Sequence, residues 1–364
     1  MRPGERQKLV EALSPPADQL ALLDAIFSPE EEFASKFEAW RRACKGAPGL
    51  ESAVLWPLVV PRLGKGGDGD RLRDQCREAY RLCWAKNALM RGRLARIVAP
   101  ALAAGSQPIL LKGNAIARHY AAGRLRGFGD TDILVAPERV TEVIRAYLAQ
   151  GWTSPKFASP ELFDPRFAHA IELHGPEGDV LDLHCQPFHH WIGWNRDMTL
   201  LEREAVPFGP SEAGLLGLRT LRREHHLLHL VANALASREA SGKWIADIIA
   251  LVESGDMDWQ LLERDSRALG IGPLVGVALE QVSSFTQAIP PGVARRLEQQ
   301  KAPARLFAFG SWLYSDDWIT RFGEHGAVLL IGGAGGSWLR AICSVPAYLR
   351  FCLARRGLRQ RSAA

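Results

Sequence analysis

The sequence lacks the features that mark secreted proteins and cysteine-rich metal proteins. Its six cysteines contain no C-x-x-C pair and are sparse for a chain of 364 residues, which argues against a disulfide framework or a zinc site of paired cysteines. The opening residues, MRPGERQKLVEAL, have no apolar core of the kind found in signal peptides. We therefore expect a cytoplasmic protein with reduced thiols.

A run of apolar residues long enough to cross a membrane is also missing. The uncharged stretch 326–339, GAVLLIGGAGGSWL, has 14 residues, whereas a helix needs about 20 to span a bilayer. This stretch predicts a buried or interfacial segment. Its GGAGG (332–336) lacks the Lys-Ser/Thr of a Walker-type phosphate loop, so we expect a flexible turn or a close helix contact there.

Lysine is scarce, although the chain is basic. Only nine of the 45 basic residues are lysines, and the net charge of +5 is spread along the chain. A dedicated nucleic-acid surface would carry a denser stripe of positive charge. The surplus suits an anionic substrate, or a weak peripheral contact with nucleic acid or a membrane. A hydrophobic content of 47% is enough for a sizeable globular core.

Hydrophobic periodicity divides the chain into four parts. Residues 1–95 are mostly helical, and a long helix over about 71–99 should end or kink at Pro100. Residues 96–210 alternate between short strands and helices, and residues 211–330 are helical again. Residues 331–364 form a tail that is first apolar and then basic.

The segment 96–210 has the pattern of a compact α/β core. PILLK (108–112) and TDILVA (131–136) predict buried strands, and each is followed by a helical stretch. FAHAIELH and VLDLHCQ flank the turn GPEGD and predict a β-hairpin. The fold class that we predict is therefore α/β (α+β), with a small mixed sheet flanked by N-terminal and C-terminal helical regions.

Three aspartates interrupt these apolar strands. Asp130 and Asp132 are two residues apart, so in a strand they point the same way, about 6–7 Å from each other. Asp182 lies between two leucines of the hairpin's second strand and shares a face with His184. Such carboxylates are tolerated if they are protonated, paired with Arg124 or Arg126, or bound to a divalent cation. Mg²⁺ prefers oxygen ligands of this kind.

The sequence LLKGN places a glycine between the first strand and its helix. Backbone N–H groups at such a junction favour a phosphate, and Lys112 adds a positive charge beside Gly113 and Asn114. A strand–Gly–helix unit followed by a D-x-D strand and a strand with a lone aspartate indicates nucleotide chemistry more strongly than any of these elements alone.

These elements resemble the polymerase-beta-type nucleotidyltransferase superfamily, and more narrowly its family of uncharacterised nucleotidyltransferases. The residues that carry the resemblance are Leu110–Gly113, Tyr120, Arg126, Gly129–Asp132 and Asp182–His184. The likeness continues in LLHL (227–230), KWIADIIALV (243–252) and DWQLLERDSRALGI (258–271), and in VPAYLRF (345–351) near the end.

The resemblance implies a role for each motif. Gly113 and Asn114 would hold the triphosphate of an NTP, with Lys112, Arg126 and Lys243 as further nucleotide-binding residues. Asp130 and Asp132 would bind Mg²⁺ or Mn²⁺. Asp182 would bind the catalytic metal and help to deprotonate the acceptor hydroxyl. Asp247 would line the cleft beside Lys243, and His184 would support Asp182 or act as a base on the acceptor side.

The function that we predict is transfer of NMP from an NTP to a hydroxyl or phosphate acceptor. Because members of the narrower family often lie near genes for ribosomally made, modified peptides, the resemblance implies a peptide or small-molecule acceptor. Two departures weaken the phosphate-loop assignment: 15 residues separate Asn114 from Asp130, and asparagine stands where the superfamily has serine. The alternatives are a non-catalytic nucleotide- or peptide-binding partner in a biosynthetic or toxin–antitoxin complex, and a phosphotransferase.

The histidines and tryptophans suggest other sites. Five histidines occur between residues 169 and 190, but no H-E-x-x-H spacing supports a zinc site. HHLLH (225–229) lies on an apolar helix and predicts core histidines. HHWIGW (189–194) is a candidate aromatic wall for a nucleobase.

Overall fold

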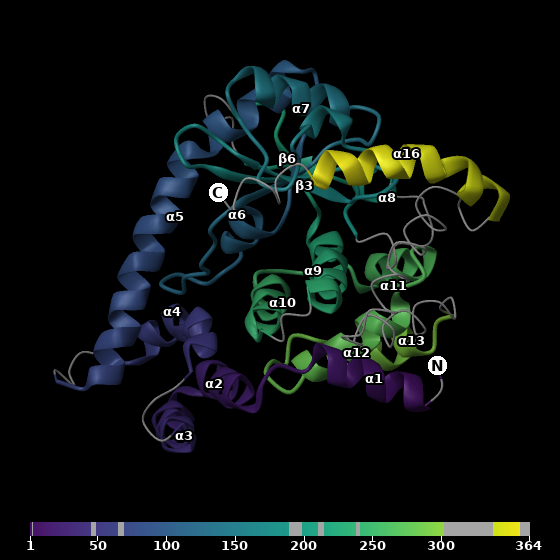
Figure 1. Cartoon of the computed structure of the whole chain (residues 1–364). Coiled ribbons are helices and arrows are strands. Elements are labelled where there is room, and N and C mark those ends of the chain that lie inside the picture. The colour runs from purple at the N-terminus through teal and green to yellow at the C-terminus, as the bar shows by residue number, and fades with distance from the viewer. Residues whose placement is uncertain are drawn as a thin grey trace. The chain divides into compact units, whose positions relative to one another are not determined.

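The computed structural model of the chain describes residues 1, 3–44, 49–64, 69–188, 199–209, 215–237, 241–301 and 338–356. The chain forms two compact units, each assembled from three separate segments of the sequence. The first unit comprises Met1–Arg91, Lys112–Gly129 and Arg223–Pro303, and the second comprises Gly92–Leu111, Asp130–Arg222 and Ala304–Ala364. Figure 1 labels their elements along the chain.

The second unit contains a mixed sheet of six short strands. They are β1 (Ile109–Leu110), β2 (Thr131–Leu134), β3 (Ala170–His174), β4 (Val180–His184), β5 (Val206–Pro207) and β6 (Arg219–Thr220). Their order in the sheet is β3-β4-β2-β1-β6-β5. The pairs β2–β4 and β1–β6 are parallel, and the other three pairs are antiparallel. The predicted fold class and the predicted hairpin are thus confirmed.

Helices complete the second unit. They are α7 (Val140–Ala149), α8 (Thr199–Arg203), α16 (Trp338–Arg356) and the short 3₁₀ helix Pro160–Leu162. Tyr147 of α7 donates a hydrogen bond of 2.7 Å to the carbonyl oxygen of Ile97. Helix α16 includes the segment VPAYLRF, and its Phe351 packs among the rings of Phe157, Phe163 and Phe167. The stretch 326–337 and the glycine run within it lie outside the described residues.

The first unit is helical. Its helices are α1 (Pro3–Leu13), α2 (Ala17–Phe27), α3 (Glu30–Ala43), α4 (Trp56–Val59), α6 (Lys112–Ala117), α9 (Arg223–Ser237), α10 (Lys243–Glu253), α11 (Trp259–Ala268), α12 (Gly272–Val282) and α13 (Val293–Glu298), with 3₁₀ turns at Leu50–Leu55 and Val60–Arg62. The HHLLH histidines of α9 are buried, as predicted, and His225 contacts Asp265 at 2.8 Å.

Helix α5 (Arg71–Ala103) contributes to both units. It was predicted to end or kink at Pro100, but it runs on to Ala103. A proline in the last turn removes only one backbone hydrogen bond, which a helix of this length tolerates. Within the described ranges, every helix is too short or too polar to cross a lipid bilayer.

Candidate functional site

The register of the central strands brings two of the three predicted aspartates together. In the parallel pair β2–β4, Asp132 lies opposite Asp182 and Leu134 lies opposite His184. Leu181 and Leu183 alternate with these polar residues and are fully buried. The apolar side chains therefore form the core on one face of the sheet, and the polar side chains project from the other.

Asp132, Asp182 and His184 form a group that could hold a metal ion. Each offers one ligand atom, and these atoms all lie within 4.8 Å of one another. Asp132 and His184 are almost completely buried, at 3% and 4% exposure. Nε2 of His184 lies 3.1 Å from Oδ1 of Asp132. His184, which was predicted to support Asp182 or to act as a base on the acceptor side, is therefore itself placed where it could be a metal ligand.

The donor set fits a divalent cation. Two carboxylates this close repel each other when both are ionised, and burial makes the repulsion stronger. A cation between them removes this cost, and carboxylate with imidazole suits Mn²⁺ as well as Mg²⁺. Nε2 of His184, which lies 3.1 Å from Oδ1 of Asp132, is the ring nitrogen that such a cation would meet.

Asp130 lies outside this group. It occupies a bend directly before β2 and is half-buried, so the strand geometry that would align its side chain with that of Asp132 starts one residue too late. The metal-binding role of Asp130 therefore stays a prediction.

The junction after β1 has an unusual backbone. Lys112 has a φ of 36°, in the left-handed region that residues other than glycine seldom adopt. Gly113 follows with φ and ψ of 18° and −108°, so the first turn of α6 is not helical. Asn114 is buried, and its Nδ2 has no hydrogen-bond partner among the described residues. An unsatisfied buried donor is costly unless a ligand accepts its hydrogen bond.

Arg126 and Asp247 form a buried pair in the first unit. Nε and Nη2 of Arg126 donate to the two carboxylate oxygens of Asp247 at 2.7 and 2.9 Å. The hydroxyl of Tyr120 donates to the same carboxylate at 2.6 Å, and Nδ2 of Asn87 donates to the carbonyl oxygen of Arg126 at 2.9 Å. Burial, and then the charge of Asp247, raises the pKa of Tyr120 well above its ordinary value.

Both arginines that were considered as counter-charges for the aspartates have other partners. Arg126 pairs with Asp247, and the guanidinium of Arg124 lies 4.9 Å from the ring centre of Phe27. Lys243 is the first residue of α10, four residues before Asp247. Nucleotide binding by Arg126 and Lys243 stays a prediction.

Two charged residues near the motifs were missed in the sequence. Glu172 lies opposite Asp182 in the hairpin, and Lys156 and His174 contact it at 2.6 and 2.7 Å. Alternation in AIELH would have placed it on the polar face. Lys86 lies beside Gly129, where an added Cβ would meet its Nζ at 2.6 Å. No local pattern indicates Lys86, because the contact joins positions far apart in the sequence.

Two comparisons with known proteins add to this geometry. A family model described as uncharacterised nucleotidyltransferase matches residues 51–287, more than half of the chain. That range includes the three aspartates, Lys112–Asn114, and the Arg126–Asp247 pair. No curated protein matches the chain.

The segment HHWIGW, considered as a nucleobase wall, lies outside the described residues.

Proposed function

Because the chain belongs to the uncharacterised nucleotidyltransferase family, we propose that it is a metal-dependent enzyme that transfers NMP from an NTP. The acceptor oxygen forms a bond to the α-phosphorus, the bond from that phosphorus to its bridging oxygen breaks, and pyrophosphate leaves. The acceptor would be a hydroxyl or phosphate group, on a peptide or a small molecule. The observation that carries the proposal is the group of Asp132, Asp182 and His184.

We assign Asp132, Asp182 and His184 to hold the cation, with Asp130 as a further ligand. A divalent cation bound there would neutralise charge on the triphosphate and lower the pKa of the acceptor hydroxyl. Asp182 has a second role in this proposal, because its carboxylate takes the proton that the hydroxyl loses. The buried Nδ2 of Asn114 supports a phosphate contact at the junction after β1, with Lys112 as the nearby positive charge.

Metal binding and label transfer together test this function. The protein is incubated with each NTP labelled at the α-phosphate, Mg²⁺ or Mn²⁺, and a cell lysate that supplies acceptors. Asp132→Asn and Asp182→Asn should each lower transfer at least about 100-fold, and both should weaken Mn²⁺–ATP binding measured by calorimetry. Glu177→Gln, an exposed change on the same hairpin (side chain 60% exposed), should alter neither.

Two results would contradict the proposal. One is equal Mn²⁺–ATP binding by the wild type and Asp182→Asn, because a ligand to the cation cannot be lost without effect. The other is labelling from γ-labelled but not from α-labelled ATP, because that outcome identifies a phosphotransferase instead.

A further inference from the structure

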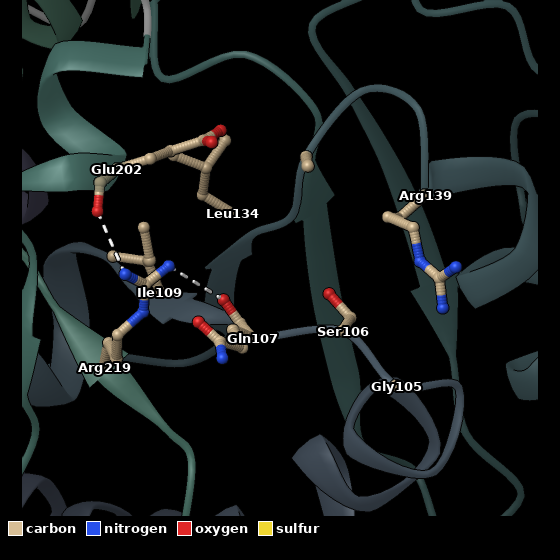
Figure 2. Close-up of a pocket in the computed structure, with 9 residues that line it drawn as sticks. Gly105, Ser106, Gln107, Ile109, Leu134, Arg139, Glu202 and Arg219 are labelled. Carbon is tan, nitrogen blue, oxygen red and sulfur yellow. Dashed lines mark hydrogen bonds between the residues drawn. The ribbon is translucent and has the colours of Figure 1, made fainter.

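The second unit contains a cavity that none of Asp132, Asp182 and His184 lines. Its volume is about 450 Å³, within the range of sites for small molecules. It lies where β1 begins and β2 ends, and its lining is Gly105, Ser106, Gln107, Ile109, Leu134, Ala136, Arg139, Glu202 and Arg219. Figure 2 shows Arg219 and Glu202 on one side and Arg139 on the other.

Opposite charges lie next to each other in this cavity without pairing. Arg219 donates to the backbone carbonyl oxygens of Glu202 and Gln107 at 3.0 and 3.5 Å, and among the described residues no carboxylate contacts its guanidinium. Likewise, no described residue forms a hydrogen bond or an ion pair with the carboxylate of Glu202. Burial, and next the charge of Glu138, raises the pKa of Glu202, whereas Arg219 lowers it. Both groups therefore retain capacity for a ligand.

The other polar side chains of the cavity lining have less need of a charged partner. Arg139 already contacts Glu142 at 2.9 Å and donates to the carbonyl oxygen of Ala104. Ser106 is buried, with only 8% of its surface exposed, and its hydroxyl has no hydrogen-bond partner among the described residues. These groups can meet an uncharged or weakly polar part of a ligand, whereas Glu202 and Arg219 require charged groups.

We propose that this cavity binds an α-amino acid, with its ammonium group at Glu202 and its carboxylate at Arg219. In an α-amino acid the two opposite charges are carried on one carbon atom, and this matches two unpaired opposite charges that line one side of a small cavity. A simple amine or a simple carboxylate would satisfy only one of them and leave the other desolvated. The side chain of the ligand then points toward Ser106.

The cavity lies on the same face of the sheet as the metal group. Ile109 is paired with both Arg219 and Leu134, and Leu134 is paired with His184. These side chains form one row across the sheet, and the row of Asp132 and Asp182 follows about 7 Å further along the strands. The amino-acid site uses none of the metal-binding residues, so this inference does not rest on the proposed nucleotidyl transfer.

Binding to the full-length protein, without metal or nucleotide, tests the inference. Each of the common L-amino acids is screened by saturation-transfer NMR. The tightest binder is then compared by calorimetry with the amine and the carboxylic acid that lack one of its two groups. We expect the amino acid to bind at least about tenfold more tightly than either, because each analogue leaves one of the two charged side chains without its partner.

A pair of neighbouring substitutions locates the site. Glu202→Gln should weaken amino-acid binding about tenfold or more, because the amide keeps the shape but loses the charge. Glu204→Gln is the matched control, because Glu204 is on the same segment and contacts Arg222 instead, at 3.1 Å. Circular dichroism should show both variants folded. If no amino acid binds, if the amine alone binds equally well, or if Glu202→Gln leaves the affinity unchanged, the inference is wrong.

Discussion

At the scale of single residues, His184 decides which cation suits the site. Its Nε2 is 3.1 Å from Asp132, and its Nδ1 is buried without a partner among the described residues. An imidazole is a good ligand for Mn²⁺ and other transition metals, whereas Mg²⁺ favours oxygen ligands only. If the group binds a cation as proposed, a nitrogen among its ligands would shift its preference toward Mn²⁺.

Replacing this nitrogen by an oxygen should reverse the preference. We expect His184→Gln to weaken Mn²⁺ binding about 10- to 100-fold while Mg²⁺ binding changes much less. Titration followed by the electron paramagnetic resonance of free Mn²⁺ measures the first quantity, and competition by Mg²⁺ measures the second. His174→Gln is the control, because His174 is 43% exposed and contacts Glu172. Unchanged Mn²⁺ affinity in His184→Gln would exclude His184 from the ligand set.

At the scale of elements, a buried carboxylate helps to fasten the β3–β4 hairpin to α5. Asp179, whose side chain is 2% exposed, contacts Arg93 at 3.1 Å and Arg96 at 2.6 Å. Arg96 also contacts Glu177, which is exposed. A buried carboxylate with two guanidinium partners holds the hairpin, and with it the strand that carries Asp182, against the helix.

Removing this carboxylate should destabilise the protein. We expect Asp179→Ala to lower the free energy of unfolding by about 3 kcal/mol, because it leaves two arginines without their buried partner. Glu177→Ala removes only an exposed partner of Arg96 and should cost less than about 1 kcal/mol. Urea denaturation followed by circular dichroism measures both. Equal effects of the two substitutions would show that the position of Asp179 has no special importance.

At the scale of the whole molecule, both compact units include discontinuous segments, and the family match runs through both. Two histidines of the first unit, His119 and His226, have lowered pKa values. Burial, and then Arg118 and Arg223, lowers the pKa of His119 to about 4. Burial, and then the neighbouring side chains of His229, His119 and Arg118, lowers the pKa of His226 well below its ordinary value. Protonation of either side chain is therefore unfavourable in the folded state.

Stability should fall as the medium is made acidic. Between pH 6.5 and about 4 the unfolded chain binds a proton at His119 and the folded chain does not, so the free energy of unfolding decreases as pH falls. The loss is about 2 kcal/mol for this residue once its partial exposure is allowed for. Urea midpoints measured from pH 7 to pH 4.5 should show a shallower slope for His119→Asn than for the wild type. Parallel slopes would mean that the pKa of His119 is not lowered in the folded state.

Local patterns predicted much of the sheet, and contacts between distant positions were the main omission. The alternation in VLDLH placed Asp182 and His184 on one face, and the turn GPEGD predicted the hairpin that the structure contains. The pair of Arg126 and Asp247 joins positions 121 residues apart, and no periodicity encodes such a contact. The same reason explains why Lys86, which lies beside Gly129, was not singled out. The burial of Asp132 likewise depends on neighbours that are remote in the chain.

The register of β2 against β4 affects how reliably the chain folds into this sheet. If β2 slipped by one position against β4, Asp132 would turn toward the side of Leu181 and Leu183. An ionised group would then sit among leucines at a cost of several kcal/mol. The buried aspartate thus disfavours a misaligned sheet, because only the observed register keeps its carboxylate on the face of the sheet that carries Asp182 and His184.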